Sequence, residues 1–148
     1  MKPIRMMIVD DLYEIRSQLA TAITVASESQ NPRIDVVGMA CNGKEAIRLV
    51  NICRPDVILM DLEMPELGGL TAASRIKKDH PQICIIALTI HDSPASRLAV
   101  VQAGMDNLIC KGASIKQIVE EVSIQKAKYD IPNALIQKDN DNTKGKRS

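Results

Sequence analysis

Acidic, hydroxyl and amino side chains follow the apolar segments of this sequence at the points where those segments end. The segments, each with the polar residues that follow it, are 4–9 with Asp10 and Asp11, 57–60 with Asp61, 83–88 with Thr89, and 108–110 with Lys111. Apolar runs of this length, of which 4–9 is broken only by Arg5, are typical of strands buried on both faces of a parallel sheet. Because open α/β sheets bind ligands beyond the carboxyl ends of their strands, these side chains are predicted to meet at one site.

The predicted site would bring the negative charges of Asp10, Asp11 and Asp61 into one pocket. Two unit charges about 4 Å apart repel by about 4 kcal/mol at the effective dielectric constant near a protein surface. A cation must therefore neutralise them, and an oxygen site with several carboxylates is what Mg²⁺ prefers. Lys111 adds a further positive charge, and Thr89 adds a hydroxyl donor.

Asp61 is the candidate acceptor of a phosphoryl group. A carboxylate beside Mg²⁺, a lysine and a hydroxyl can attack phosphorus and become an acyl phosphate, while its neighbours stabilise the equatorial oxygens. No general base is needed, because the carboxylate is already ionised. The residue types therefore favour phosphoryl transfer to Asp61.

Helical periods separate the apolar segments. Apolar residues at helical spacing begin at Leu12, and Asp11 can cap the amino end of this predicted helix. Residues 34–39 are predicted to form a strand, and Asp35 within it suits a position at the edge of the sheet. Further helices are predicted around residues 46–53, 70–76, 94–103 and 115–122, with Gly104 as a C-terminal cap. Five alternations of strand and helix predict a doubly wound α/β domain with right-handed crossovers.

Composition and length narrow the classes of protein. One domain is predicted over residues 1–128, followed by a polar extension, 129–148, that is partly or wholly disordered. The net charge of +1 and the near absence of aromatic residues argue against direct nucleic-acid binding and against an anionic membrane surface. The four cysteines are far apart, so no zinc site is expected. No signal peptide or membrane span is expected, and the protein is predicted to be cytoplasmic.

The ordered set of these residues resembles the receiver domain of two-component response regulators, over nearly all of residues 4–127. The set is Asp10-Asp11, Asp61-x-x-Met64-Pro65, Gly69, Thr89, Ala103-Gly104 and Lys111, and the segment 42–46 is most similar to NarL/FixJ-type receivers. The resemblance implies a flavodoxin-like five-stranded parallel sheet, order 2-1-3-4-5, flanked by five helices. It also implies a signalling protein, not an enzyme, with self-catalysed phosphotransfer and dephosphorylation.

The resemblance assigns a role to each residue of the site. Asp61 would be phosphorylated by a histidine kinase. Mg²⁺ would be bound by Asp11, Asp61 and the main-chain carbonyl of Glu63, with Asp10 helping through water. Thr89 and Lys111 would contact the phosphoryl group.

The sequence departs from the family pattern at two positions near the site. Leu108 stands where the family usually has Tyr or Phe, and Ile90 stands where a small residue usually follows the threonine and would narrow access to the phosphoryl group. The alternative function is therefore a receiver-like interaction module that phosphorylation does not switch. No helix-turn-helix follows residue 127, so the chain is either a stand-alone receiver or a regulator cut at its linker.

Each feature alone has a simpler explanation. Asp10-Asp11 alone would more often cap a helix, Asp61-x-x-Met64-Pro65 would form a turn, Thr89 would end a strand, and Lys111 would be a surface lysine.

In combination these residues favour a phosphorylation switch whose output surface is built by residues 93–103, 108–110 and 114–127. The output partner is unknown. A homodimer through the last helix or the face beside it is predicted from four apolar residues of that helix, unless the sheet buries them: Ile115, Ile118, Val119 and Val122. A flavodoxin-like enzyme is disfavoured, because neither a glycine-rich phosphate loop nor a Cys/His or Ser/His set is present.

Overall fold

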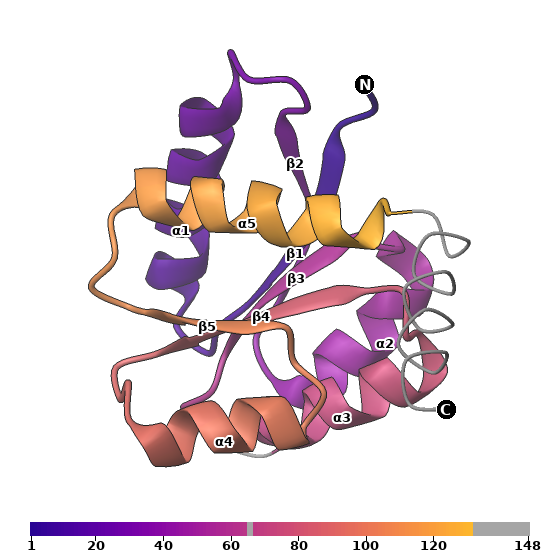
Figure 1. Ribbon diagram of the computed structural model, residues 1–148, viewed down its shortest axis with the longest axis vertical. Helices are drawn as coiled ribbons and strands as arrows, with labels where there is room; N and C mark the ends of the chain where they lie inside the picture. The colour runs from indigo at the N-terminus through magenta and orange to yellow at the C-terminus, as the bar shows by residue number, and fades with distance from the viewer. Residues whose placement is uncertain (65–66, 132–148) are drawn as a thin grey trace, which may run out of the picture.

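Five parallel strands alternate with five helices in the computed structural model, which describes residues 1–64 and 67–131 (Figure 1). The strands are β1 Ile4–Val9, β2 Ile34–Ala40, β3 Val57–Asp61, β4 Cys84–Thr89 and β5 Asn107–Cys110. The helices are α1 Tyr13–Ser27, α2 Gly43–Cys53, α3 Gly69–Asp79, α4 Pro94–Gln102 and α5 Ile115–Tyr129. The strand order β2-β1-β3-β4-β5 confirms the predicted flavodoxin-like fold. Pro65 and residues 132–148 of the predicted extension lie outside the described residues.

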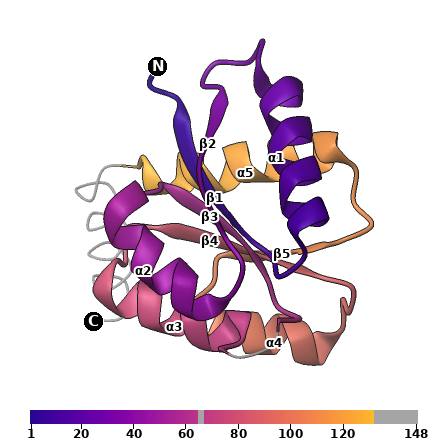
Figure 2. The ribbon, with the colours of Figure 1, turned by 180° about the vertical axis from the view of Figure 1, so that it is seen from behind.

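The apolar runs became strands because both faces of the sheet are covered. β3 is buried at every position, whereas β2, which carries Asp35, is only partly buried and lies at the edge as predicted. Figures 1 and 2 show α1 and α5 on one face and α2, α3 and α4 on the other. Alternate residues of each strand feed the two cores: Met7 and Val9 of β1 face α2 and α3, while Met6 and Ile8 face α1 and α5. No helix among the described residues has the length and apolar character needed to cross a membrane.

The apolar face of α5 is turned into the protein. Ile118, Val119 and Val122 are buried against the sheet and α1. These residues therefore cannot form a dimer surface, so the expectation that they mediate a homodimer is wrong. The homodimer itself stays a prediction.

Side-chain hydrogen bonds cap the starts of α2, α4 and α5, but not that of α1. Ser93 caps α4, and the Ser114 side chain forms a reciprocal capping box with Gln117 on α5. Gly104 follows α4 with φ +80°, which confirms the predicted cap. The predicted Asp11 cap is wrong: the N-cap of α1 is Leu12, whose N–H donates instead to Asp10 Oδ1 at 2.9 Å.

Tyr129, the last residue of α5, is tied to the opposite layer at the amino-terminal edge of the sheet. Its hydroxyl donates to Asp106 Oδ1 at 2.6 Å, and Lys77 Nζ lies 4.9 Å from its ring centroid. Lys77 Nζ also pairs with Asp106 Oδ2 at 2.9 Å. The three side chains join the ends of α3 and α5 to the turn before β5.

Gly69 lets the start of α3 lie against the backbone of Asp61. A Cβ added at Gly69 would lie 2.4 Å from the carbonyl oxygen of Asp61, whereas one added at Gly68 would meet nothing within 4 Å. The absence of a side chain at Gly69 is therefore what allows the loop after β3 to close over the strand end.

We expect Gly69→Ala to lower the free energy of unfolding by about 1–3 kcal/mol, because backbone atoms must move to admit the methyl group. Gly68→Ala is the matched control. Alanine reduces the entropy of the unfolded chain, which stabilises the fold, but it is less favourable than glycine at an N-cap. Because these effects oppose one another, the free energy of unfolding should change by no more than about 0.5 kcal/mol. Urea unfolding of the three proteins measures both values, and equal stability of the two variants would contradict the close approach.

Candidate functional site

Backbone hydrogen bonds at the carboxyl ends of the strands join β1 to β2, β3 to β4 and β5 to β4. The N–H of Asp10 donates to the Ala40 carbonyl at 3.1 Å, and that of Leu62 donates to Leu88 at 3.0 Å. The N–H of Lys111 donates to the Thr89 carbonyl at 2.9 Å. These bonds bring residues that are far apart in the sequence to one edge of the sheet.

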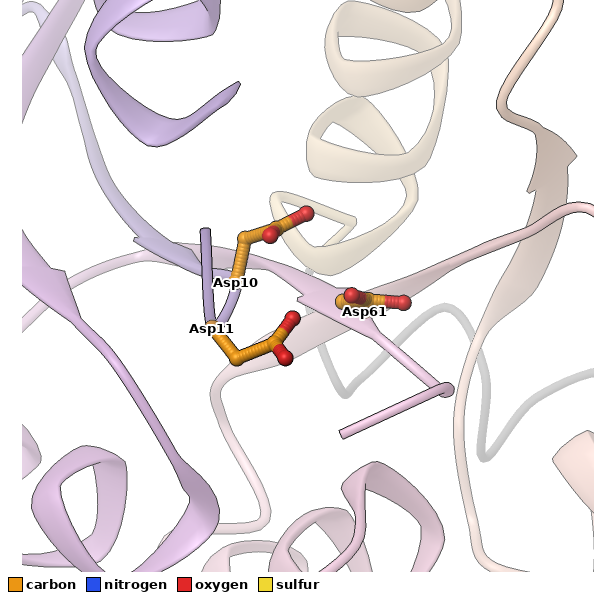
Figure 3. Close-up of side chains that lie close together, drawn as sticks. All are labelled: Asp10, Asp11 and Asp61. Atoms are coloured by element: carbon orange, nitrogen blue, oxygen red, sulfur yellow. The ribbon is translucent and has the colours of Figure 1, made fainter. Parts of the chain in front are cut away.

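Asp10, Asp11 and Asp61 form the acidic cluster predicted from the strand ends (Figure 3). One carboxylate oxygen from each lies within 4.8 Å of the others. Asp10 and Asp61 are each 1% exposed, whereas Asp11 is partly exposed. Asp11 lies beside this cluster and does not cap α1, and its neighbour Asp10 accepts the hydrogen bond from the N–H of Leu12 just before the helix.

Lys111 supplies the positive charge of the site. Its Nζ lies 2.9 Å from Asp61 Oδ1, 3.8 Å from Asp10 Oδ2 and 3.9 Å from Glu63 Oε2. Burial alone would lower the pKa of Lys111, but its bond to Asp61 and the surrounding negative charges raise the pKa above its usual value. The amine is therefore held in its charged form.

Asp61 has one bonded oxygen and one unbonded oxygen. Oδ1 accepts from the N–H of Glu63 at 2.9 Å and from Lys111, whereas Oδ2 is buried and accepts no hydrogen bond from the described residues. Burial raises the pKa of Asp61 to about 6, and the nearby Asp10 charge adds to this, although Lys111 and the Glu63 N–H oppose it.

The Thr89 hydroxyl is hydrogen-bonded both as a donor and as an acceptor. It donates to Glu63 Oε1 and accepts from the N–H of His91 at 3.0 Å. Burial would raise the pKa of Glu63, but the Thr89 hydroxyl and the charge of Lys111 hold that pKa below its usual value. The position of Glu63, two residues after Asp61, indicates from sequence that it lies near the site, but no sequence signal indicates this side-chain bond.

The two departures from the family pattern differ in their burial. Leu108 is 5% exposed and belongs to the core under α4, with Val100 and Met105. Ile90, which follows Thr89, is largely exposed.

The donor set fits a small divalent cation. Asp10 Oδ2 is a buried oxygen that accepts no hydrogen bond from the described residues, and the carboxylates of Asp11 and Asp61 lie beside it. Oxygen ligands that carry negative charge and lack other partners are what Mg²⁺ requires.

Comparisons with known proteins agree with this geometry. Residues 6–123 match the family model described as response regulator receiver domain. The chain is 36% identical over 119 residues to the response regulator protein VraR of Staphylococcus aureus, covering 80% of this chain and 54% of VraR, so it spans about half the length of that relative. A two-component response regulator of the LuxR family from Aurantimonas sp. superposes with a TM-score of 0.77 at 28% identity, covering 86% of this chain and 87% of that one. The response regulator domain of Thermotoga maritima CheB gives a TM-score of 0.71 at 29% identity, with 88% and 99% covered.

We expect Asp61→Asn to raise the free energy of unfolding of the metal-free protein at pH 7.5 by about 1–3 kcal/mol, as one pKa unit corresponds to 1.36 kcal/mol. The pKa of Asp61 is raised in the folded state from 3.8 to about 6. The stability that the protonated carboxyl contributes is therefore complete below pH 3.8 and is lost as the pH rises through about 6.

Urea unfolding in a chelating buffer at several pH values measures this effect. The difference between wild type and Asp61→Asn should shrink below about pH 4. Glu28→Gln, which neutralises an exposed carboxylate after α1, is the control and should show no such dependence. A difference that stays constant with pH would contradict a buried charge at Asp61.

Proposed function

The chain belongs to the family of response regulator receiver domains, and we propose that it is a phosphoacceptor switch of a two-component system. In this proposal Asp61 takes a phosphoryl group from a histidine kinase, and the modified domain changes its binding to an output partner. The observation that carries the proposal is the buried Asp61 carboxylate, with one oxygen held by Lys111 and the other unbonded beside two further carboxylates.

Asp61 Oδ2 is the proposed nucleophile, because its lone pairs are not engaged by any described residue. As the new O–P bond forms, the P–N bond to the donor histidine breaks. Lys111 stays charged and faces the oxygens of the transferred group, while the N–H of Glu63 keeps Oδ1 in place. The same groups would support self-catalysed dephosphorylation, and no other enzymatic activity is proposed.

Mg²⁺ is the proposed cofactor. Asp10, Asp11, Asp61 and the main-chain carbonyl of Glu63 would hold it, with Asp10 acting through water. When bound, the ion would offset the negative charge of the carboxylates and of the incoming phosphoryl group.

The kinase is proposed to approach across the start of α1. Leu12 and Tyr13 are exposed there, and an apolar cavity of about 360 Å³ between α1 and α5 reaches Asp10 and Lys111. An apolar surface beside a charged site suits a protein donor, because it provides affinity without occupying the reacting groups.

The output surface is proposed on α4, β5 and α5, at residues 93–103, 108–110 and 114–127. Leu98 and Val101 of α4 are exposed apolar residues within this surface. The partners that bind the other domains of the relatives are not proposed for this chain. Direct nucleic-acid binding by this chain is not proposed either. A cytoplasmic location and a homodimer stay predictions.

A module that phosphorylation does not switch is the second candidate. It is favoured by Leu108, a buried aliphatic side chain that has no aromatic ring to move between the surface and the interior. The two candidates agree on the chemistry at Asp61 and differ in whether phosphorylation there changes the output surface.

We expect Mg²⁺ with beryllofluoride, a phosphoryl mimic, to shift the amide resonances of Asp61, Thr89 and Lys111 in the wild type. Asp61→Asn should remove the shifts, because the attacking oxygen is lost, whereas Glu28→Gln should behave as wild type. Acetyl phosphate should likewise add one phosphoryl group by mass to wild type and to Glu28→Gln, but not to Asp61→Asn. An equal response of Asp61→Asn would overturn the proposal.

Sedimentation and partner-binding measurements with and without the mimic separate the two candidates. Changes at residues 93–103 and in partner affinity would support the switch. Binding of the mimic at Asp61 with neither change would favour the unswitched module.

A further inference from the structure

The Thr89 hydroxyl is fully engaged before any phosphoryl group arrives. A hydroxyl carries one proton, and that proton is donated to Glu63 Oε1. Its oxygen accepts from the N–H of His91 at 3.0 Å. Thr89 is 1% exposed, so water does not offer its hydroxyl an easy replacement partner.

The Glu63 carboxylate draws on two of the groups that a phosphoryl group on Asp61 would use. Oε1 accepts from Thr89, and Oε2 lies 3.9 Å from Lys111 Nζ. The carboxylate is also anionic and has an acceptor oxygen directed to each partner, as a phosphoryl group would.

We propose that the side chain of Glu63 competes with the phosphoryl group for the Thr89 hydroxyl. By accepting this hydrogen bond, Glu63 holds Thr89 in the arrangement that it has while Asp61 is unphosphorylated. This inference rests on the proposed function. It assigns a regulatory role to the side chain of Glu63, whose main-chain carbonyl was predicted to bind Mg²⁺. Glu63 is a positioning residue here, since it acts through Thr89. A phosphoryl group must take the Thr89 proton from Glu63, and the Glu63 side chain, whose exposed fraction is 35%, has room to turn outward.

The competition extends to the loop after β4. His91 donates to the same hydroxyl oxygen, and Ser93, two residues later, caps α4. When Thr89 turns from Glu63 to a phosphoryl oxygen, the hydrogen bond of His91 must change as well. Release of Glu63 is thereby linked to the start of α4, the helix of the proposed output surface.

Affinity for beryllofluoride, measured by titration calorimetry at saturating Mg²⁺, tests the competition. We expect Glu63→Ala to lower the Kd about 10-fold, the size set by one hydrogen bond to a charged group. Glu63→Gln should lower it by about 3-fold, because its amide oxygen can still accept from Thr89 but has no charge. Glu28→Gln should leave the Kd unchanged. Saturating Mg²⁺ removes any effect of the lost charge on metal binding.

The same substitution in a Thr89→Val background separates competition for the hydroxyl from simple charge repulsion. Without the Thr89 proton, Glu63→Ala should lower the Kd by no more than about 3-fold. A further readout is the amide resonance of His91. In Glu63→Ala without beryllofluoride it should move toward its position in the beryllofluoride-bound wild type.

Each outcome supports or overturns the inference. An unchanged Kd in both Glu63 variants, or the same gain of about 10-fold with and without Thr89, would overturn it while leaving the phosphoacceptor function intact, provided that wild type binds and Asp61→Asn does not. Failure of wild type and of the Glu63 variants to bind beryllofluoride would instead overturn the proposed function. Should Glu63→Ala not fold, Glu63→Gln in the two backgrounds decides alone.

Discussion

The ion pair between Lys111 Nζ and Asp61 Oδ1 is the contact on which the rest of the site depends. Burying a carboxylate without a partner is costly, and here Asp61 is buried beside a second buried carboxylate, Asp10. Lys111 lies near both, so it lowers the repulsion without removing it. Burial is the main cause of the raised pKa of Asp61, and the charge of Asp10 adds to it, so a further positive charge near the two carboxylates would stabilise their ionised forms.

The fold supplies this arrangement through the parallel sheet. Because the strand ends meet at one edge, a single bond from Lys111 N–H to the Thr89 carbonyl places the lysine and the threonine together. Gly69 lets the following helix close over Asp61 without pushing the strand aside. The backbone bond of Lys111 and the missing side chain of Gly69 each involve few atoms. Both act on backbone whose side chains belong to the site.

The strand-end rule was sufficient to predict the positions of Asp10, Asp61, Thr89 and Lys111, because apolar runs and a parallel sheet leave little freedom there. It could not predict which of two adjacent aspartates bonds to the start of α1, since that depends on the turn between Asp10 and Leu12. It also could not predict the bond between Glu63 and Thr89, which joins side chains 26 residues apart. Helical periodicity identified the apolar face of α5 correctly, but whether Val119 and Val122 meet the sheet or a partner is a tertiary property.

Tyr129 has a consequence for the end of α5. Its bond to Asp106 anchors the end of the helix at the edge of the sheet opposite to Asp61. A helix of 15 residues spans about 22 Å. The end of α5 at this anchor is therefore remote from the acidic cluster, because the length of the helix separates them. A change at Asp61 can reach this end of α5 by shifting a whole secondary-structure element or by loosening the contacts of the tyrosine.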